Sequence, residues 1–158
     1  MGYVDQIAVA KAIAMDAHAG QFDKLGQPYI DHPRRVAARV RSITGEAVAW
    51  LHDVVEDTPV TLDLLRSEGL YPTVVDAVDA ITHRKAEPRV EYYERVKSNP
   101  FALTVKLADI ADNTDPRRLV SLDAQTLYRL LKKYALALDA LSEPLRALGG
   151  SEYTKTED

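Results

Sequence analysis

The chain has 158 residues, no cysteine and a formal net charge of −4 at pH 7. This length suits one domain around one core, and the lack of cysteine excludes disulfides, thiolate metal sites and a cysteine nucleophile. A nucleic acid polymer is disfavoured as a partner because no basic excess is present, whereas a few local cations suffice for a small anionic ligand. No apolar run reaches the ~18 residues of a membrane span, and charged residues interrupt the N-terminal segment, so no membrane association and a cytoplasmic location are expected.

Helical periodicity dominates the first third of the chain. Apolar residues with helical spacing predict a helix over 3–18, and Gly20, Gly26 and Pro28 predict a loop over 19–31. Pro33 suits the first position of a helix that reaches about residue 43, which places His32 at or next to the N-cap. Gly45 is expected to break the chain before a buried helix over 46–56.

The remaining segments continue the helical pattern. Helices are predicted from 61 to before Gly69, over 72–82, over 92–97, over 101–111 and over 122–148, with a polar loop over 83–89. We therefore predict an all-α, single-domain bundle of about eight helices within residues 1–148. Residues 149–158 are expected to form a disordered polar tail.

Charged residues within the apolar segment AWLHDVVEDT, residues 49–58, need an explanation because an unpaired buried charge is costly. Helical spacing would place His52, Asp53, Glu56 and Asp57 on one broad face. His52 and Asp53 offer a nitrogen and an oxygen to one ion, and a carboxylate one turn further on could take a proton from an attacking water. An exposed polar stripe is the alternative interpretation of the same spacing.

Two further segments carry candidate ligands. Lys106, Asp109 and Asn113 lie at i, i+3 and i+7 in VKLADIADN, residues 105–113, where Asp109 could bind a metal and Lys106 a phosphate or a buried carboxylate. A surface ion pair with an Asn helix cap is the alternative. His32, held next to Pro33, could direct a ring nitrogen into a cleft, although a lone histidine is more often structural. Two His and two Asp ligands suit Mn²⁺, Fe²⁺, Co²⁺, Ni²⁺ or Zn²⁺ better than Mg²⁺ or Ca²⁺.

The segments AHAGQFDKLGQPYIDHP at 17–33, AWLHDVVEDT at 49–58 and VKLADIADN at 105–113 occur in an order that resembles the HD superfamily. They are most similar to the hydrolase domain of the RelA/SpoT alarmone enzymes and their small stand-alone relatives. The resemblance implies an all-helical bundle that uses Mn²⁺ to remove pyrophosphate from the 3′ position of ppGpp. It matches the metal ligands to His32, His52, Asp53 and Asp109, the water-activating acidic pair to Glu56 and Asp57, and substrate contacts to Lys24 and Asn113.

The chain also departs from the pattern of this family. Asp23 stands where the alarmone hydrolases carry an Arg that contacts the guanine base, and an acidic group cannot stack or donate in that way. Ile110 and Asp112 replace an Arg and a His, and Pro116 replaces a Thr near the sugar. A metal-dependent phosphohydrolase acting on a small anionic nucleotide is therefore expected, with ppGpp as the first candidate substrate. A different nucleotide, or a non-catalytic nucleotide-binding module, is the alternative, and the oligomeric state stays open.

Overall fold

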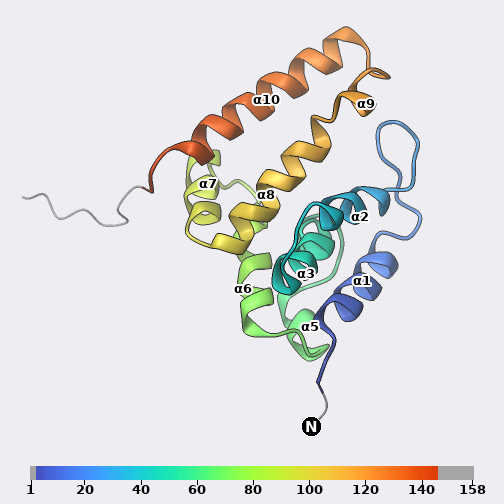
Figure 1. The fold of residues 1–158 in the computed structure, drawn as a ribbon, viewed down its shortest axis with the longest axis vertical. Coiled ribbons are helices and arrows are strands. Elements are labelled where there is room, and N and C mark those ends of the chain that lie inside the picture. Colours follow the sequence, from blue (N-terminus) through green and yellow to red (C-terminus); the bar gives the residue numbers. More distant parts are fainter. Residues whose placement is uncertain (1–2, 146–158) are drawn as a thin grey trace, which may run out of the picture.

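A computed structural model describes residues 3–145, and the helices in these residues surround one core (Figure 1). The all-α prediction is confirmed, because the only strand-like feature in this described part is an isolated bridge between Phe22 and Pro28. No helix within the same range is both long and apolar enough to cross a membrane. The helices are α1 (Gln6–Ala17), α2 (Asp31–Ala38), α3 (Ile43–Leu51), α4 (Val54–Asp57), α5 (Leu62–Ser67), α6 (Pro72–Ile81), α7 (Arg89–Lys97), α8 (Pro100–Asn113), α9 (Pro116–Leu119) and α10 (Ala124–Ser142).

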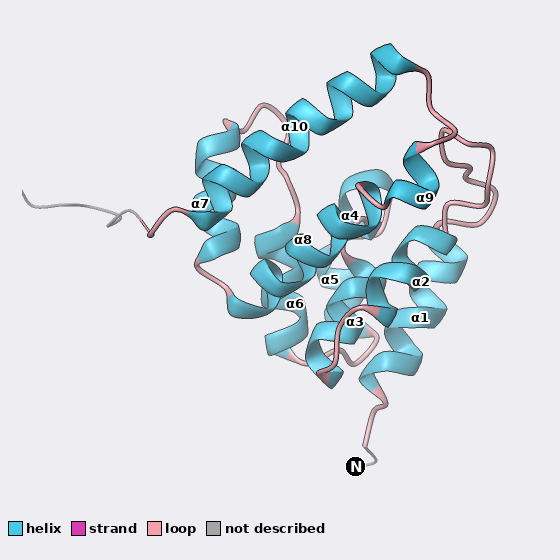
Figure 2. Ribbon diagram, turned by 45° about the horizontal axis from the view of Figure 1, so that its top comes forward, coloured by secondary structure: helices cyan, strands magenta, loops and turns pink. Residues whose placement is uncertain are grey.

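Helix α3 is the centre of the core and contacts α1, α2, α6 and α8 (Figure 2). Its segment from Ala47 to Leu51 is entirely buried. A helix that is apolar on nearly every side must be covered by neighbours, and the small Ala47 and Ala49 allow those neighbours to approach closely. This position brings the C-terminal end of α3, where His52 follows, into the middle of the molecule.

The start of α3 differs from the prediction, because Gly45 lies inside its first turn and does not break the chain. The break lies earlier, where α2 ends at Ala38, and Ser42 caps α3 by accepting a hydrogen bond from the Gly45 amide at 3.0 Å. Glycine is required here for space: a Cβ at this position would lie 2.6 Å from both Oγ of Ser42 and Cγ1 of Val40. In α2, Pro33 is the third residue and not the first, which is tolerated because first-turn amides lack helical partners anyway.

The predicted single helix over 46–56 is divided in two, because α3 ends at Leu51 and α4 begins at Val54. At the junction, Nδ1 of His52 lies 2.7 Å from the Ala49 carbonyl oxygen, so the side chain binds a carbonyl at the end of α3. Asp53 adopts φ −107° and ψ −4° and caps α4. The two candidate ligands His52 and Asp53 therefore lie at the break between the two helices.

The C-terminal part of the described chain forms a layer beside the core. The short α9 was not predicted, and the predicted helix over 122–148 corresponds to α10, which packs on α7 and α8. In Figure 1, α10 runs along one outer edge of the molecule, with α8 between it and the core helices. Residues 149–158, for which a disordered tail was predicted, lie outside the described residues.

Candidate metal centre and substrate cavity

The side chains of the four predicted ligands converge from three elements: α2, the α3–α4 junction and α8. Nε2 of His32 lies 2.9 Å from Oδ1 of Asp109 and 3.2 Å from Nε2 of His52. Nε2 of His52 lies 3.0 Å from Oδ2 of Asp53 and 3.5 Å from Oδ1 of Asp109. Two atoms that each bind one ion at about 2.1 Å lie about 3.0 to 3.4 Å apart at octahedral or tetrahedral angles. With Nε2 of His32 and Oδ2 of Asp53 3.7 Å apart, the five separations range from 2.9 to 3.7 Å and bracket those of atoms that can share one divalent ion.

The hydrogen bonds of the two rings direct their free nitrogens at the same point. Nδ1 of His52 must carry a proton, because the Ala49 carbonyl can only accept. Nδ1 of His32 lies 2.7 Å from Oδ2 of Asp112, so this nitrogen also donates. In the neutral rings both Nε2 atoms then present lone pairs to each other and to Asp109. Such a group needs positive charge at its centre, either protons on the rings or a bound cation.

The histidine pKa values reflect this demand for positive charge. Burial opposes the protonated form of His52, but the negative charges of Asp53 and Asp109 outweigh it and raise its pKa well above the ordinary value. The pKa of His32 is also raised, because hydrogen bonds to Asp109 and Asp112 outweigh its burial. The carboxylates respond in the opposite direction: despite burial, the charge of His52 lowers the pKa of Asp53 to about 2.

Asp109 is held on both of its oxygens by the residues that the sequence placed on its helix face. Lys106 Nζ donates to Oδ2 at 3.1 Å, and Asn113 Nδ2 donates to Oδ1 at 2.9 Å. The Lys106–Asp109 pair is largely buried, so it is not the surface ion pair that the spacing also allowed. Burial lowers the pKa of Lys106, but the charge of Asp109 outweighs burial, so the net pKa is raised. The ammonium of Lys106 is therefore held in its charged form. Both residues therefore position the aspartate and also line the cavity described below.

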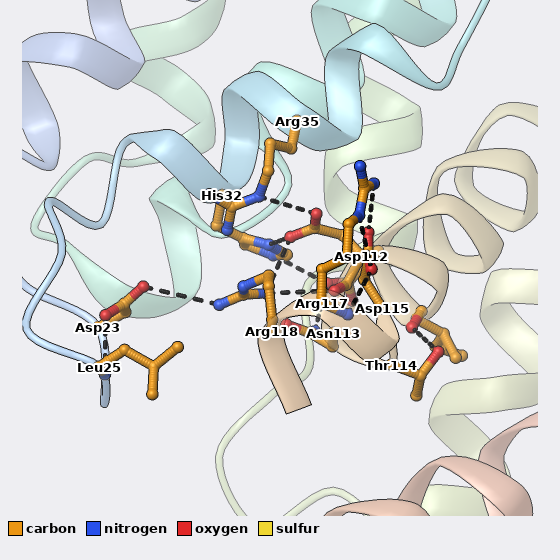
Figure 3. Close-up of polar contacts among 12 residues, drawn as sticks. Asp23, Leu25, His32, Arg35, Asp112, Asn113, Thr114, Asp115, Arg117 and Arg118 are labelled. Carbon is orange, nitrogen blue, oxygen red and sulfur yellow. Dashed lines mark hydrogen bonds and ion pairs between the residues drawn. The ribbon is translucent and has the colours of Figure 1, made fainter. Parts of the chain in front are cut away.

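Asp112 is a site residue whose role the sequence did not indicate. It is fully buried and accepts a hydrogen bond from His32 and one from Arg35 Nε at 2.8 Å. Arg118 adds a third contact, with NH1 3.1 Å from Oδ2 of Asp112, and reaches towards Asp23 on its other side (Figure 3). Burial raises the pKa of Asp112, but the hydrogen bonds from His32 and Arg35 lower it to about 2. An ionised Asp112 fixes the tautomer and the orientation of the His32 ring.

Tyr29 was also missed by the sequence analysis. Its hydroxyl donates to Oδ2 of Asp53, the oxygen that faces His52. Burial and the charge of Asp53 raise the pKa of Tyr29, so the hydroxyl keeps its proton. The signal available in the sequence was its position three residues before His32, within the loop that leads into α2.

The predicted acidic pair lies beside this cluster. One carboxylate oxygen each of Asp53, Glu56 and Asp57 lie within 4.8 Å of one another. Burial raises the pKa of Glu56, and the negative charges of Asp53 and Asp57 raise it further. The pKa of Asp57 is raised by burial and then by Asp53. Carboxylates with raised pKa values are stronger bases, and both line a cavity next to the histidines.

The cavity has a volume of about 340 Å³ and is bounded by α7, α8, α10 and the loop before α2. His32, Asp53 and Asp109 form part of its wall, so the cluster is open to a ligand in the cavity. The positively charged side chains of the lining are Lys24, Arg89, Lys106, Arg118 and Lys133. The apolar and aromatic ones include Leu25, Leu119, Leu122, Leu130 and Tyr134. This combination suits a ligand with an anionic part and a planar apolar part.

Comparison with known proteins identifies relatives of this chain. It is 35% identical, over 92% of its length, to a guanosine-3′,5′-bis(diphosphate) 3′-pyrophosphohydrolase of Haemophilus influenzae. It is 28% identical, also over 92% of its length, to the bifunctional (p)ppGpp synthase/hydrolase SpoT of Escherichia coli. The chain is related to the ppGpp 3′-pyrophosphohydrolases. It spans 23% of the first of these relatives and 24% of the second, and no family model matches it.

A solved structure with the same fold covers nearly all of the chain. It is described as a metazoan ortholog of SpoT that hydrolyzes ppGpp, and it superposes with a TM-score of 0.72 over 93% of this chain and 90% of its own. At 22% identity this likeness establishes the fold. The resemblance to the RelA/SpoT hydrolases inferred from three short segments is thus confirmed over most of the chain.

The departures from these pyrophosphohydrolases have structural roles here. The Asp23 carboxylate accepts from the amides of Leu25 and Gln27, each at 2.9 Å, and so shapes the loop that carries Lys24. It also faces Arg118, with an N–O distance of 3.6 Å. Ile110 is a buried core residue, and Pro116 begins α9. Together, Asp23 and Arg118 place an oppositely charged pair in the cavity wall, where the family pattern has an Arg at the position of Asp23.

Proposed function

We propose that this chain is a metal-dependent phosphohydrolase that removes pyrophosphate from the 3′ position of ppGpp or a closely similar nucleotide. The observation that carries the proposal is the meeting of two groups in one cavity: four candidate ligand atoms that need a positive charge at their centre, and an acidic pair with raised pKa values. The relatives named above are ppGpp hydrolases, which supports the same substrate class.

The proposed ligands are His32, His52, Asp53 and Asp109, and their donor set suits Mn²⁺ or another divalent transition metal such as Fe²⁺, Co²⁺, Ni²⁺ or Zn²⁺. The fit rests on the separations of 2.9 to 3.7 Å among their facing atoms and on the two imidazole lone pairs that need a cation. A bound ion supplies Lewis acidity at a phosphoryl oxygen and makes water more acidic.

The remaining steps belong to the side chains. Glu56, assisted by Asp57, takes the proton from the attacking water, and the raised pKa of Glu56 makes it a better base at neutral pH than an ordinary glutamate. Lys106 stays charged and, together with Lys24, stabilises the negative charge that develops on the phosphoryl oxygens. Asn113 keeps Asp109 in place, and the apolar part of the cavity takes the nucleoside.

A different nucleotide is the second candidate substrate, and the observation in its favour is Asp23. A carboxylate held by two backbone amides is a fixed hydrogen-bond acceptor, whereas the family pattern provides a cationic donor at this position. The groups of a base that this wall can recognise therefore differ from those read by an arginine.

One experiment tests both candidates. The purified chain, supplied with Mn²⁺, is assayed for release of pyrophosphate from ppGpp and for hydrolysis of a panel of other nucleotides. Selective turnover of ppGpp supports the first candidate, and faster turnover of another nucleotide supports the second. An Asp53→Ala variant that keeps its bound metal and full activity would refute the proposed site, and bound nucleotide without turnover would make the chain a binding module.

A further inference from the structure

Helix α10 has a second apolar face that no described element covers. Its inner residues Tyr134, Ala137 and Leu141 face the rest of the molecule, where α10 packs on α7 and α8. A different set of residues forms what we call the outer stripe, and all of them are exposed: Tyr128, Leu131, Ala135, Leu138 and Ser142. Tyr128 is 68% exposed, and Leu131 and Leu138 are each more than 40% exposed. In both ribbon views α10 lies at the edge of the molecule (Figures 1 and 2).

The spacing of the outer stripe is that of a helix that packs against another helix. Its members follow one another at intervals of three, four, three and four residues, which is the a/d pattern of a coiled coil. Helical geometry places them within one narrow face about 21 Å long. Single exposed apolar residues scattered over a surface are common and need no explanation. Exposed apolar residues aligned along one helix face, in contrast, mark a contact surface.

The charges beside the stripe indicate which partner fits. The first half of α10 is basic, with the exposed side chains of Arg129 and Lys132, and the second half carries the exposed Asp139. In heptad terms Lys132 and Asp139 occupy successive e positions, which oppose each other when two copies of one helix pack antiparallel. Parallel packing would instead bring the two basic halves together.

We propose that the outer stripe is a homodimer interface in which α10 packs antiparallel against α10 of a second copy. The two-fold axis passes between Ala135 and Leu138, so Ala135 of one copy faces Leu138 of the other and Leu131 faces Ser142. Each Lys132 then lies opposite Asp139 of the other copy, twice per dimer, as an isologous interface requires. The contact is small, so its dissociation constant is expected in the micromolar range.

The dimer also concerns the cavity, because α10 contributes to both. Leu130, Lys133 and Tyr134 line the cavity from one side of the helix, while the outer stripe occupies another. A second copy therefore holds the helix that forms one wall of the cavity. The evidence for the interface comes from the surface of α10 alone, so the dimer proposal does not depend on the proposed catalytic activity.

The oligomeric state tests the interface. Sedimentation equilibrium between about 1 and 100 µM is expected to show a reversible dimer. Leu138→Glu is expected to weaken dimerization at least about 10-fold by placing a charge in the stripe. Leu136→Glu is the matched control: Leu136 is 62% exposed on the same helix but lies outside the stripe, so this variant should dimerize normally. A monomer at every concentration, or equal loss in both variants, would overturn the proposal.

Two further measurements test the antiparallel orientation. Lys132→Glu or Asp139→Lys alone places like charges in opposition and should weaken the dimer, whereas the double variant should restore it. The absence of cysteine in the chain makes single-cysteine crosslinking unambiguous. Leu131→Cys mixed with Ser142→Cys should form disulfide-linked dimers on oxidation, whereas each alone should not, because identical positions lie about 16 Å apart along the axis. Crosslinking of Ser142→Cys with itself would show a parallel arrangement and refute the proposed one.

Discussion

Acidification from about pH 6 to about pH 5 is expected to weaken Mn²⁺ binding by the metal-free protein about 100-fold. Nε2 of both His32 and His52 must be unprotonated to bind an ion, and both pKa values are raised above the ordinary value by the surrounding carboxylates despite burial. Below these pKa values the ion must displace two protons. Each proton costs about 1.4 kcal/mol per pH unit, so the two together cost about 2.7 kcal/mol.

The carboxylates add little to this dependence. The pKa of Asp53 is lowered to about 2 by the charge of His52 despite burial, and that of Asp109 lies well below its ordinary value because the charge of Lys106 outweighs burial. Both therefore stay ionised throughout the window, and the histidines alone set the slope.

Isothermal titration calorimetry of the metal-free protein with Mn²⁺, repeated in buffers of different ionisation enthalpy, measures both the affinity and the number of protons released. About two protons per ion are expected at low pH. Release of less than about half a proton, together with an affinity independent of pH, would refute the assignment of the two histidines as ligands.

The same histidines are expected to make the metal-free Tm and the increase in Tm caused by Mn²⁺ change in opposite directions with pH. A raised pKa means that the protonated ring favours the folded chain, so this contribution is complete below the unfolded pKa of about 6.5 and is lost as the pH rises through the folded pKa. The metal-free Tm is therefore expected to fall above neutral pH, while the increase in Tm caused by Mn²⁺ grows. Differential scanning fluorimetry with Mn²⁺ or with a chelator measures both, and a metal-induced shift that shrinks as the pH rises would contradict this.

Three substitutions test separate parts of the site and the fold. Asp112→Asn removes the charge that orients His32, so Mn²⁺ affinity in calorimetry should fall about 10- to 100-fold, and an unchanged affinity would deny it a positioning role. Glu56→Gln removes the proposed base, so kcat for ppGpp should fall about 100-fold or more while Mn²⁺ affinity is retained; a kcat near that of the natural chain would exclude Glu56 as the base. Gly45→Ala should lower the free energy of unfolding by about 1–3 kcal/mol, because the new Cβ would lie 2.6 Å from Ser42 Oγ. Urea denaturation measures this, and a stabilised variant would contradict it, since Ala in a helix is otherwise favoured over Gly.

The sequence determined those parts of the molecule that depend on neighbours along one helix. Helical periodicity was sufficient for the all-α class and for most helix positions, because a buried face repeats every 3.6 residues whatever it packs against. The contacts of Lys106 and Asn113 with Asp109 follow from intervals of three and four residues on α8. The three short segments that resemble the RelA/SpoT hydrolases are likewise local, which is why the sequence alone indicated the relationship.

Tertiary structure alone decided the contacts between distant segments. In the sequence, Asp112 is only a departure from the family pattern. The packing of α2 on α8 places it against His32, a histidine 80 residues earlier in the chain. The division of the helix over 46–56 depends equally on the surroundings, since a continuous helix satisfies the same local pattern. Arg118 contacts both Asp112 and Asp23 because α9 lies beside the loop before α2. Spacing along a chain fixes the direction of a side chain on its own helix, whereas the partner it reaches depends on how whole helices pack.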